Sequence, residues 1–515
     1  MNLTKIFDLN FNYKRKGNFF FVNDRYRFEK NLRSLIFSRV LNKYYNMGPI
    51  IITDKTNYNN NNLYKKSKIK YVSLREKISI KKIILYSNVL LSILNFYFKI
   101  SLKKKKIEWL INNYKIRQVK IGDLIYDYYV RYNNNYIEPN VYSITFLKVL
   151  FDGIFKIIFI SYYFKKYKPK LILSTSKGYT SIGNLIVRIG TKQNIKTIST
   201  GYNYIYKYRS YQDSFKSIWK ISKKQIDNLE KKISINKINN FSNKRILGKK
   251  YGNYVSHKTL DKAFKTQNDL KFIYKILKEK KNKKIIVFAL HCFSDAPHTS
   301  GNLIFNDYYD QFTSTIQYIA KNNDENFFWI IKPHPARNNY NEKGIIENYL
   351  RKFKFKNVVM CTKNIKNNIL IKYTDFLITS NSTIGLEFAC SGKKTILGGD
   401  SPYYFKNLFI KPKNKKEYFD IIKNLNKKNI FLSKKDTNFA KKILYYLEHA
   451  TNITLPGSKF MPNPIINPLI DNEKNYKKQI IVNCKNNLKV LDNKHFVKEK
   501  FYIELKKILK SLANG

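Results

Sequence analysis

The sequence predicts an α/β protein with more than one domain. The chain has 515 residues, which is long enough for two or three separate cores. It is 43% hydrophobic and 16% aromatic, so most of it is expected to fold. Short apolar runs bounded by turn-forming residues alternate with segments of helical periodicity. This alternation is typical of parallel sheets covered by helices.

A first α/β domain is predicted for residues 1–260. Its clearest unit is a strand that begins the segment LILSTSKGY (171–179), followed by a helix at 181–191 and a strand at 196–199. A long helix is expected at 144–168, where interspersed charges argue against a membrane span. Residues 1–80 are polar and aromatic, with an Asn-rich loop at 57–62.

The segment 83–100, IILYSNVLLSILNFYFKI, is the most membrane-like in the chain. Lysine pairs or clusters flank it on both sides, but Ser, Asn and Lys within it weaken the case for a spanning helix. A helix buried in the protein core is the favoured interpretation. An interfacial helix with snorkelling lysines is the alternative.

A second α/β domain is predicted for residues 261–470. Strands are expected at 285–290, 327–332, 357–361, 375–379 and 394–398. Helices are expected at 307–321, 341–354 and 383–391, with two more near 414–426 and 436–449. Residues 471–515 are assigned to a C-terminal helical segment, with an amphipathic helix at 498–512 that we expect to pack back on the first domain.

The net charge of +63 favours an anionic partner, such as a lipid surface, a phosphorylated substrate or a nucleic acid. The positive residues are spread along the whole chain, so the charge alone has weak specificity. The four cysteines form neither a zinc motif nor a disulfide framework, which favours a reducing compartment. The N-terminus lacks the layout of a signal peptide, and a cytoplasmic location is expected.

Polar clusters end the apolar runs of the second domain, and the carboxyl ends of parallel strands are where such sheets bind ligands. The turn after 376–378 carries hydroxyl and amide groups that suit a phosphate, or that simply cap a helix: Ser380, Asn381, Ser382 and Thr383. After 327–331, two prolines hold His334 in Lys332-Pro333-His334-Pro335. His334 then donates to a phosphate or assists a leaving group, with Lys332 or Arg337 as the cation; a rigid turn is the alternative.

The segment HCFSDAPH (291–298) follows the first strand of the same domain and should reach the same edge. Asp295 is the best-placed general base, with His298 and His291 as rivals; an Asx-turn at Asp295 is the alternative. Glu387, one turn into the helix after Thr383, is a candidate acceptor for sugar hydroxyls, with solvent exposure as the alternative. No metal ligand set and no cofactor motif is found.

These motifs resemble a known family. KPHP (332–335) and TSNSTIGLEFACSGKKTIL (379–397) are similar to the HP and Ser/Thr motifs of bacterial capsule and surface polysaccharide glycosyltransferases, such as Kdo transferases and sialyltransferases. SDAPH (294–298) and NDYYDQF (306–312) also look like the opening of their nucleotide domain. The resemblance implies the GT-B fold, in which two Rossmann-like domains face a central cleft.

The resemblance also implies the roles of residues. His334, Ser380, Ser382 and Thr383 would hold the donor phosphate, and Glu387 would bind the nucleoside or sugar. In the first domain, which would bind the acceptor, the similarity touches only STSKGYTSIGN (174–184). The acceptor-side candidates are Ser174, Ser176, Lys177 and Tyr202.

The function expected is transfer of a sugar from a nucleotide-sugar to a capsular or other surface polysaccharide or glycolipid, with a CMP-activated acidic sugar as the candidate donor. The enzyme would work without a metal, at the inner face of the membrane, where its positive charge meets anionic lipid. No nucleic acid partner is expected. The alternatives are a glycerol-phosphate polymer transferase, against which Asn381 and Glu387 argue because that family has Asp there, and a non-catalytic basic protein that binds glycan or nucleic acid.

Overall fold

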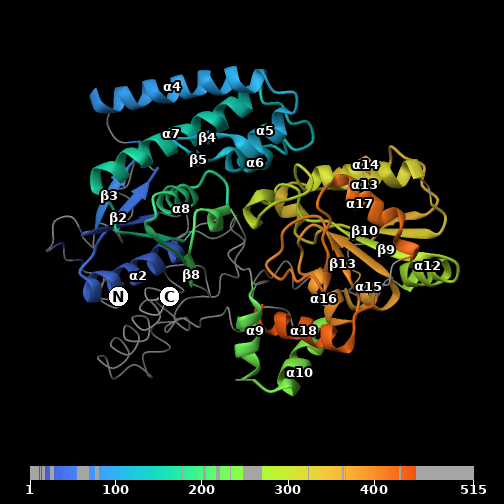
Figure 1. The fold of residues 1–515 in the computed structure, drawn as a ribbon. Helices are drawn as coiled ribbons and strands as arrows, with labels where there is room; N and C mark the ends of the chain where they lie inside the picture. The colour runs from blue at the N-terminus through green and yellow to red at the C-terminus, as the bar shows by residue number, and fades with distance from the viewer. Residues whose placement is uncertain are drawn as a thin grey trace. The chain divides into compact units, whose positions relative to one another are not determined.

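The structure is a computed structural model. It describes residues 11, 13, 18–23, 28–54, 69–75, 80–175, 178–200, 205–215, 221–231, 233–247, 270–322, 324–361, 365, 367–427 and 431–447. These residues fall into two compact units (Figure 1). The described part of unit 1 comes from Met1–Tyr128 and Val141–Ser214, and that of unit 2 from Tyr129–Asn140 and Phe215–Asn452.

Unit 1 is built on a six-stranded sheet. The strand order is β3-β2-β1-β6-β7-β8, and every neighbouring pair is parallel except β7 with β8. This order is that of Rossmann-type sheets, in which the connections reverse between the two central strands. At that reversal the side-chain oxygen Oδ1 of Asn23 accepts a hydrogen bond of 2.8 Å from the backbone N–H of Thr175. The strands are β1 (Phe19–Asn23), β2 (Gly48–Thr53), β3 (Lys70–Ser73), β6 (Leu171–Ser174), β7 (Lys196–Thr200) and β8 (Ile205–Tyr208).

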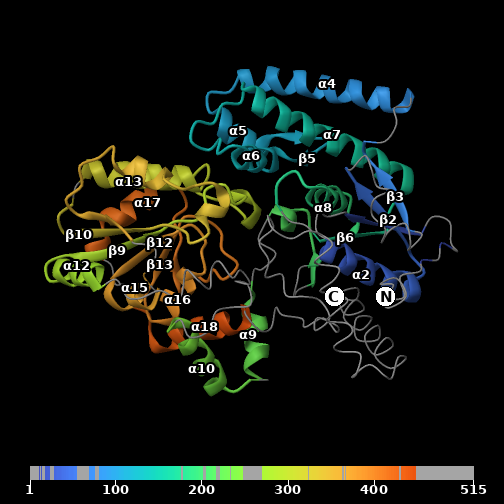
Figure 2. The ribbon, with the colours of Figure 1, turned by 180° about the vertical axis from the view of Figure 1, so that it is seen from behind.

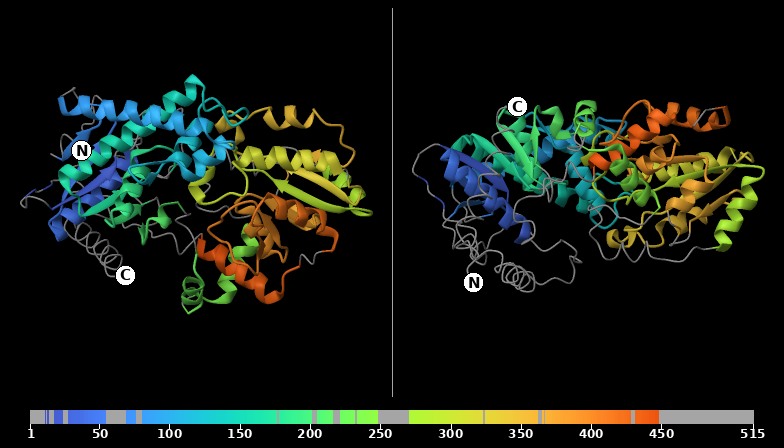
Figure 3. Two further views of the ribbon diagram at one scale, coloured as in Figure 1. Left: turned by 45° about the horizontal axis from the view of Figure 1, so that its top comes forward. Right: turned by 90° about the horizontal axis from the view of Figure 1, so that it is seen from below.

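Long helices cover this sheet. The helix α7 (Ile144–Tyr167) is capped by the hydroxyl of Ser143, and much of its length is buried. Figure 1 shows α4 (Ile80–Ser101) as an outer layer against α7, and Figure 3 gives two further views of the pair. The other elements of the unit are α2 (Phe28–Tyr45), α5 (Lys106–Asn113), α6 (Gly122–Arg131, which ends in unit 2), α8 (Ile182–Lys192), η2 (Gln212–Phe215) and the hairpin β4 (Lys115–Ile116) and β5 (Val119–Lys120).

The predicted strand–helix–strand unit at 171–199 and the long helix at 144–168 are confirmed. Three strands that precede residue 80 were not predicted. The apolar runs at 19–22 and 50–52 follow the same pattern as the predicted strands, and they were overlooked because the segments around them are polar. The segment 83–100 forms a helix, but the prediction that it is buried in the core is wrong for one side of the helix, where Leu91, Leu94 and Phe98 are exposed.

Unit 2 repeats the same strand order, but its last strand is parallel to its neighbour. Its strand order is β11-β10-β9-β12-β13-β14, and all neighbouring pairs are parallel. The predicted α/β class with two Rossmann-like domains is therefore confirmed, and so are the predicted strands and the main helices of the second domain. The strands are β9 (Lys284–Ala289), β10 (Phe327–Lys332), β11 (Val358–Met360), β12 (Phe376–Thr379), β13 (Thr395–Leu397) and β14 (Phe409–Ile410), the last of which was not predicted.

Helices cover both faces of the second sheet (Figure 1, Figure 2). One face packs on α12 (Leu270–Lys280), α15 (Asn367–Tyr373) and α16 (Ile384–Cys390), through Ile276, Leu370 and Phe388. The strands are buried on both sides, which explains their continuous apolar runs. The remaining helices are α9 (Lys223–Glu230), α10 (Ile235–Ile246), α13 (Tyr308–Asn322), α14 (Ile345–Leu350), α17 (Lys415–Lys423) and α18 (Lys434–Tyr445), with 3-10 turns η3 (Pro297–Ser300), η4 (Arg337–Tyr340) and η5 (Leu425–Lys427).

The main segment of unit 2 begins at Phe215, earlier than the predicted boundary near residue 260. Residue 260 itself lies outside the described residues. The helices α9 and α10 precede that boundary, yet they pack in unit 2 against α16 and α18. The segment Tyr129–Asn140 also belongs to unit 2. The predicted C-terminal segment 471–515 lies outside the described residues.

Candidate active site

The candidate site lies at the carboxyl ends of β9, β10 and β12, which are neighbours in the second sheet. The connections reverse direction between β9 and β12, and sheets of this order bind ligands in the crevice at such a reversal. The three polar segments that the sequence singled out follow these three strands: 290–298, 333–335 and 380–383. The topology thus brings them to one edge of one sheet.

Stacked rings connect the three segments. The ring of His291 lies 5.3 Å from that of His334 and 4.5 Å from that of Tyr308, measured between ring centres. The hydroxyl of Tyr308 accepts a hydrogen bond of 3.1 Å from the side-chain amide of Asn381. His334 and Asn381 are therefore joined through two aromatic side chains, one from the end of β9 and one from the first residue of α13.

His334 is held as a neutral imidazole. The backbone N–H of Ala336 lies 3.2 Å from its Nδ1, and because an amide N–H only donates, Nδ1 is an acceptor and the ring proton is on Nε2. The thiol of Cys292 lies 3.0 Å from the same Nδ1. Burial, together with the nearby His291 and Lys332, lowers the pKa of His334 to about 3. At neutral pH this residue offers a hydrogen-bond donor, and Lys332 supplies the positive charge.

The hydroxyl-rich turn has two kinds of residue. The hydroxyl of Ser380 is buried and donates to the side-chain oxygen of Gln311 on α13, and the backbone carbonyl of Ser382 accepts from the hydroxyl of Tyr403. Thr383 is exposed at the start of α16, and its hydroxyl makes no capping hydrogen bond. The alternative that these residues only cap a helix is therefore wrong for Thr383, whose hydroxyl is available to a ligand.

Glu387 is buried, at 4% exposed, so the alternative of solvent exposure is wrong. Its carboxylate lies 3.2 Å from the guanidinium of Arg245 on α10 and accepts a hydrogen bond of 2.8 Å from the amide of Asn367 on α15. The side chain thus ties three helices together. A role in sugar binding stays a prediction, and its partners within unit 2 give it a structural role that the sequence did not indicate.

Asp295 is partly exposed, and its carboxylate accepts no hydrogen bond from the described residues. The turn at this position is made by its backbone, whose N–H donates to the carbonyl of Cys292 at 3.2 Å. The Asx-turn alternative, in which the carboxylate bonds its own backbone, is therefore not what the described residues show. His298 is buried in η3, at 8% exposed, and is less accessible to an acceptor than Asp295.

A buried polar cluster beside this loop was missed from the sequence. The carboxylate of Glu342 accepts from the N–H of Ser294 at 3.0 Å and from its hydroxyl at 3.2 Å. Arg131 donates to the same hydroxyl at 3.3 Å and lies over the ring of Tyr340 at 4.4 Å. Burial raises the pKa of Glu342 to about 7, although its hydrogen bonds and Arg131 act against that rise. No sequence signal joins residues 131, 294 and 342, because they meet only in the fold.

Arg337, the alternative cation near His334, is not available for a ligand. Its guanidinium is buried and forms two hydrogen bonds, of 2.7 and 3.1 Å, with the carboxylate of Glu347. Such a bidentate pair uses the fork of the guanidinium, so of the two predicted cations only Lys332 remains a candidate.

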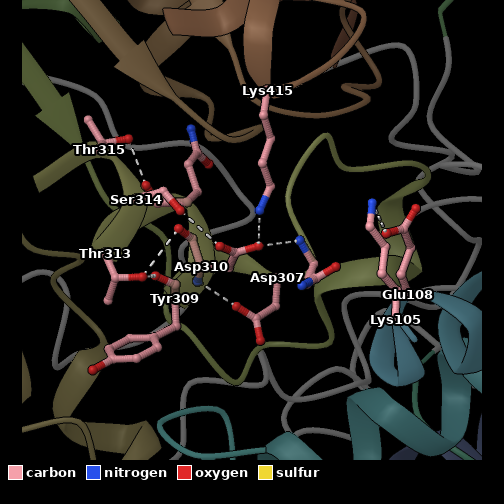
Figure 4. Close-up of polar contacts among 11 residues, drawn as sticks. Lys105, Glu108, Asp307, Tyr309, Asp310, Thr313, Ser314, Thr315 and Lys415 are labelled. Atoms are coloured by element: carbon pink, nitrogen blue, oxygen red, sulfur yellow. Dashed lines mark hydrogen bonds and ion pairs between the residues drawn. The ribbon is translucent and has the colours of Figure 1, made fainter. Parts of the chain in front are cut away.

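The first turn of α13 positions Tyr308 and Gln311, which the sequence also missed as site residues although NDYYDQF contains them. The N–H of Asp310 donates to the carboxylate of Asp307 at 2.7 Å, which caps the helix. The carboxylate of Asp310 in turn accepts from Ser314 at 2.9 Å and pairs with Lys415 at 2.7 Å (Figure 4). These contacts fix the start of the helix, and residues 308 and 311 lie on one side of it.

The acceptor-side candidates are only partly described. Ser174 is buried, and its hydroxyl donates to the carbonyl of Gly183 at 3.1 Å, so it serves the packing of α8 on β6. Ser176, Lys177 and Tyr202 lie outside the described residues. Within the described ranges, no group of three or more His, Cys, Asp or Glu side chains is arranged to hold a metal ion.

The fold and the site define a Rossmann-type α/β protein with polar side chains gathered at the carboxyl edge of its second sheet. Residues 210–446 match the sequence model of a family described as capsule polysaccharide biosynthesis protein. The match includes every strand of the second sheet and every residue predicted to bind the donor, and it confirms the predicted resemblance over this segment. No curated protein matches the chain significantly.

Solved structures give weaker similarities. A glycosyltransferase from Rickettsia africae is 12% identical, with 93% of this chain and 100% of that chain covered, at a TM-score of 0.25. KpsC, a beta Kdo 2,4 transferase from Thermosulfurimonas dismutans, is 12% identical over 53% of this chain and 79% of that one, at a TM-score of 0.30. UDP-GlcNAc 2-epimerase from Neisseria meningitidis is 12% identical, with 91% of this chain and 99% of that chain covered, at a TM-score of 0.21. TM-scores this low do not establish a function.

Proposed function

We propose that this protein is a glycosyltransferase that moves a sugar from a nucleotide-sugar donor to a capsular or other surface glycan. One observation carries the proposal: His334 follows β10, and Asn381 and the exposed hydroxyl of Thr383 follow β12, so they end the two strands that flank β9 at the switch point of the sheet. That sheet lies inside the segment matched by the capsule biosynthesis family. The donor is proposed to be a CMP-activated acidic sugar, and the acceptor a polysaccharide or a lipid-linked glycan.

The chemistry proposed is a displacement at the anomeric carbon of the donor. The acceptor oxygen forms a bond to that carbon, and the bond from the carbon to the donor phosphate oxygen breaks. Asp295 takes the proton of the acceptor hydroxyl, because its carboxylate is partly exposed and accepts no hydrogen bond from the described residues. The released nucleotide carries the negative charge that develops on the phosphate.

Neutral donors and one cation would stabilise that charge. The Nε2–H of His334 donates to a phosphate oxygen, since its Nδ1 is already an acceptor. The hydroxyl of Thr383 donates a second hydrogen bond, and Lys332 adds positive charge at the end of β10. Fixed donors aimed at a developing charge are typically worth about a hundredfold or more in rate each. No step in this scheme requires a metal ion.

The test combines ligand binding with transfer. Thermal unfolding of the purified protein is measured with CMP, UDP, GDP, CDP and TDP, and the nucleotide that stabilises it identifies the donor class. Stabilisation should fall in His334→Asn and Thr383→Val. Thr437→Val on α18 removes a hydroxyl far from the site in the sequence and serves as the matched control. If no nucleotide raises the unfolding temperature, or if both site variants respond like the parent, the donor site is refuted.

The protein is also proposed to work in the cytoplasm at the inner face of the membrane. The net charge of +63 supports this location, because the cytoplasmic leaflet carries anionic lipid.

A further inference from the structure

One side of α4 is apolar and exposed. At about 100° per residue, its buried side chains lie on one side of the helix and its exposed apolar side chains on the opposite side. The buried side consists of Leu85, Val89, Ile93, Phe96 and Ile100. The exposed side consists of Ile83, Ile84, Leu90, Leu91, Leu94 and Phe98, which are 54–68% exposed. A contiguous stripe of this length is unusual on a soluble protein and marks an interaction surface.

The buried side of α4 is committed to the protein. The ring of Phe96 stacks on Phe146 of α7 at 5.7 Å, and the ring of Tyr86 stacks on Phe155 at 5.7 Å. By length and composition, Lys82–Ser101 would suffice to cross a membrane. A crossing helix, however, needs lipid or apolar partners around its whole circumference within the bilayer, whereas α4 is attached along its length to a globular unit. The exposed stripe therefore suits a surface that lies parallel to the helix.

The charges on α4 identify the kind of partner. The helix contains no Asp or Glu, and Lys99 near its end is followed by Lys103 and Lys104, all three exposed. A second copy of the chain docked on this stripe would bring further lysines to lysines. Anionic lipid headgroups complement the charge of these lysines instead, and the exposed leucines can insert among the acyl chains.

The neighbouring end of α7 extends the apolar surface. Ile144 is 71% exposed, and Leu147 and Phe151 are each 38% exposed. These residues are spaced by three and four, so they lie on one side of α7. The ring of Tyr142, just before α7, stacks on Tyr97 of α4 at 6.1 Å, which places the starting end of α7 beside the final turns of α4.

We propose that the exposed side of α4, with Lys99, Lys103 and Lys104, docks flat on a membrane that contains anionic lipid. The stripe inserts among the headgroups and upper acyl chains, and the lysines remain at the headgroup level. The proposal gives a surface to the location proposed above, and it is tested by lipid binding alone, so its failure is distinguishable from a failure of glycosyl transfer.

The experiment is flotation of the purified full-length protein with vesicles of phosphatidylglycerol and phosphatidylethanolamine, and with vesicles of phosphatidylcholine alone. The test variant is the triple change Leu91→Gln, Leu94→Gln and Phe98→Gln, which alters exposed residues and should fold. The matched control changes three exposed apolar residues of unit 2: Ile235→Gln, Leu247→Gln and Tyr274→Gln. A third variant, Lys103→Gln with Lys104→Gln, tests the charge.

The parent protein and the control should float with the anionic vesicles, and the triple variant should bind them at least about tenfold more weakly, since three apolar side chains leave the interface. The lysine variant should bind the anionic vesicles more weakly than the parent, and its binding should depend less on salt concentration. Equal binding by the parent and the triple variant overturns the proposal, as does a parent that binds no vesicles. A parent dimer that the triple change converts to a monomer, without effect on lipid binding, assigns the stripe to self-association and also overturns it.

Discussion

Replacing Glu387 by alanine should destabilise unit 2 more than it weakens ligand binding. The carboxylate and its partner Arg245 have side chains only 6% and 10% exposed, and Asn367 adds a hydrogen bond of 2.8 Å. Removing one member of a buried ion pair leaves an uncompensated charge and costs about 3–5 kcal/mol. For a unit of this size, 1 kcal/mol corresponds to roughly 2–4 °C, so the unfolding temperature should fall by about 6–20 °C.

The assay is thermal unfolding of the parent and of three variants. Arg245→Ala should be destabilised by a similar amount, and Arg245→Met combined with Glu387→Leu should recover much of the loss, because no buried charge is left alone. Glu108→Ala is the control, since it removes one partner of the exposed pair Lys105–Glu108 (Figure 4), and such pairs contribute at most about 1 kcal/mol.

Two results would refute this reasoning. If Glu387→Ala unfolds within a degree or two of the parent, the contacts with Arg245 and Asn367 do not hold the helices together. If that variant also loses nucleotide binding while remaining as stable as the parent, the carboxylate serves the ligand, as the family resemblance implies, and the structural role assigned above is wrong.

Three further predictions follow from the site. His334→Asn should lower glycosyl transfer by about a hundredfold or more with little change in unfolding temperature, and full activity in this variant would remove His334 from the mechanism. Glu342→Gln should become more stable relative to the parent as the pH rises. Because the pKa of Glu342 is raised from 4.5 to about 7 in the folded state, its contribution to the free energy of unfolding is fully present below pH 4.5 and is lost as the pH rises through 7. Denaturant unfolding at pH 5 and 8.5 measures this, and a difference that is independent of pH contradicts it. Asp307→Ala should cost about 0.5–2 kcal/mol through loss of the cap of α13, and unfolding like the parent would show that the cap is dispensable.

The sequence predicts the parts of this fold whose pattern is local. The runs that became β9, β10 and β12 are continuous apolar segments between breakers, because both faces of each strand are buried. The same rule placed His334 and Asn381 at one sheet edge. The same rule applies to the apolar runs of β1 and β2, which were overlooked among polar segments. It left open whether the second side of α4 is buried or exposed, because an apolar helix has the same sequence pattern in both cases.

The partners of the site residues depend on the fold and were not predictable. Glu387 meets Arg245 and Asn367 across 142 and 20 residues of chain, and Glu342 meets Ser294 across 48. Sequence chemistry proposed ligand contacts for Glu387 because a carboxylate near a phosphate turn has that potential. Only the packing of α10 against α16 shows that the same group completes a buried ion pair.

The two sheets have the same strand order, but different contacts join the two central strands, between which the connections reverse direction. In unit 1 the ends of β1 and β6 are joined by a direct hydrogen bond between Asn23 and Thr175, whereas in unit 2 the ends of β9 and β12 are connected through the rings of His291 and Tyr308. For the nucleotide site proposed above, this connection is a defined place at which an engineer can begin to change the preference. Tyr308→Phe retains the stacked ring and releases the amide of Asn381, so the recognition of a base or phosphate can be retuned without disturbing the sheet.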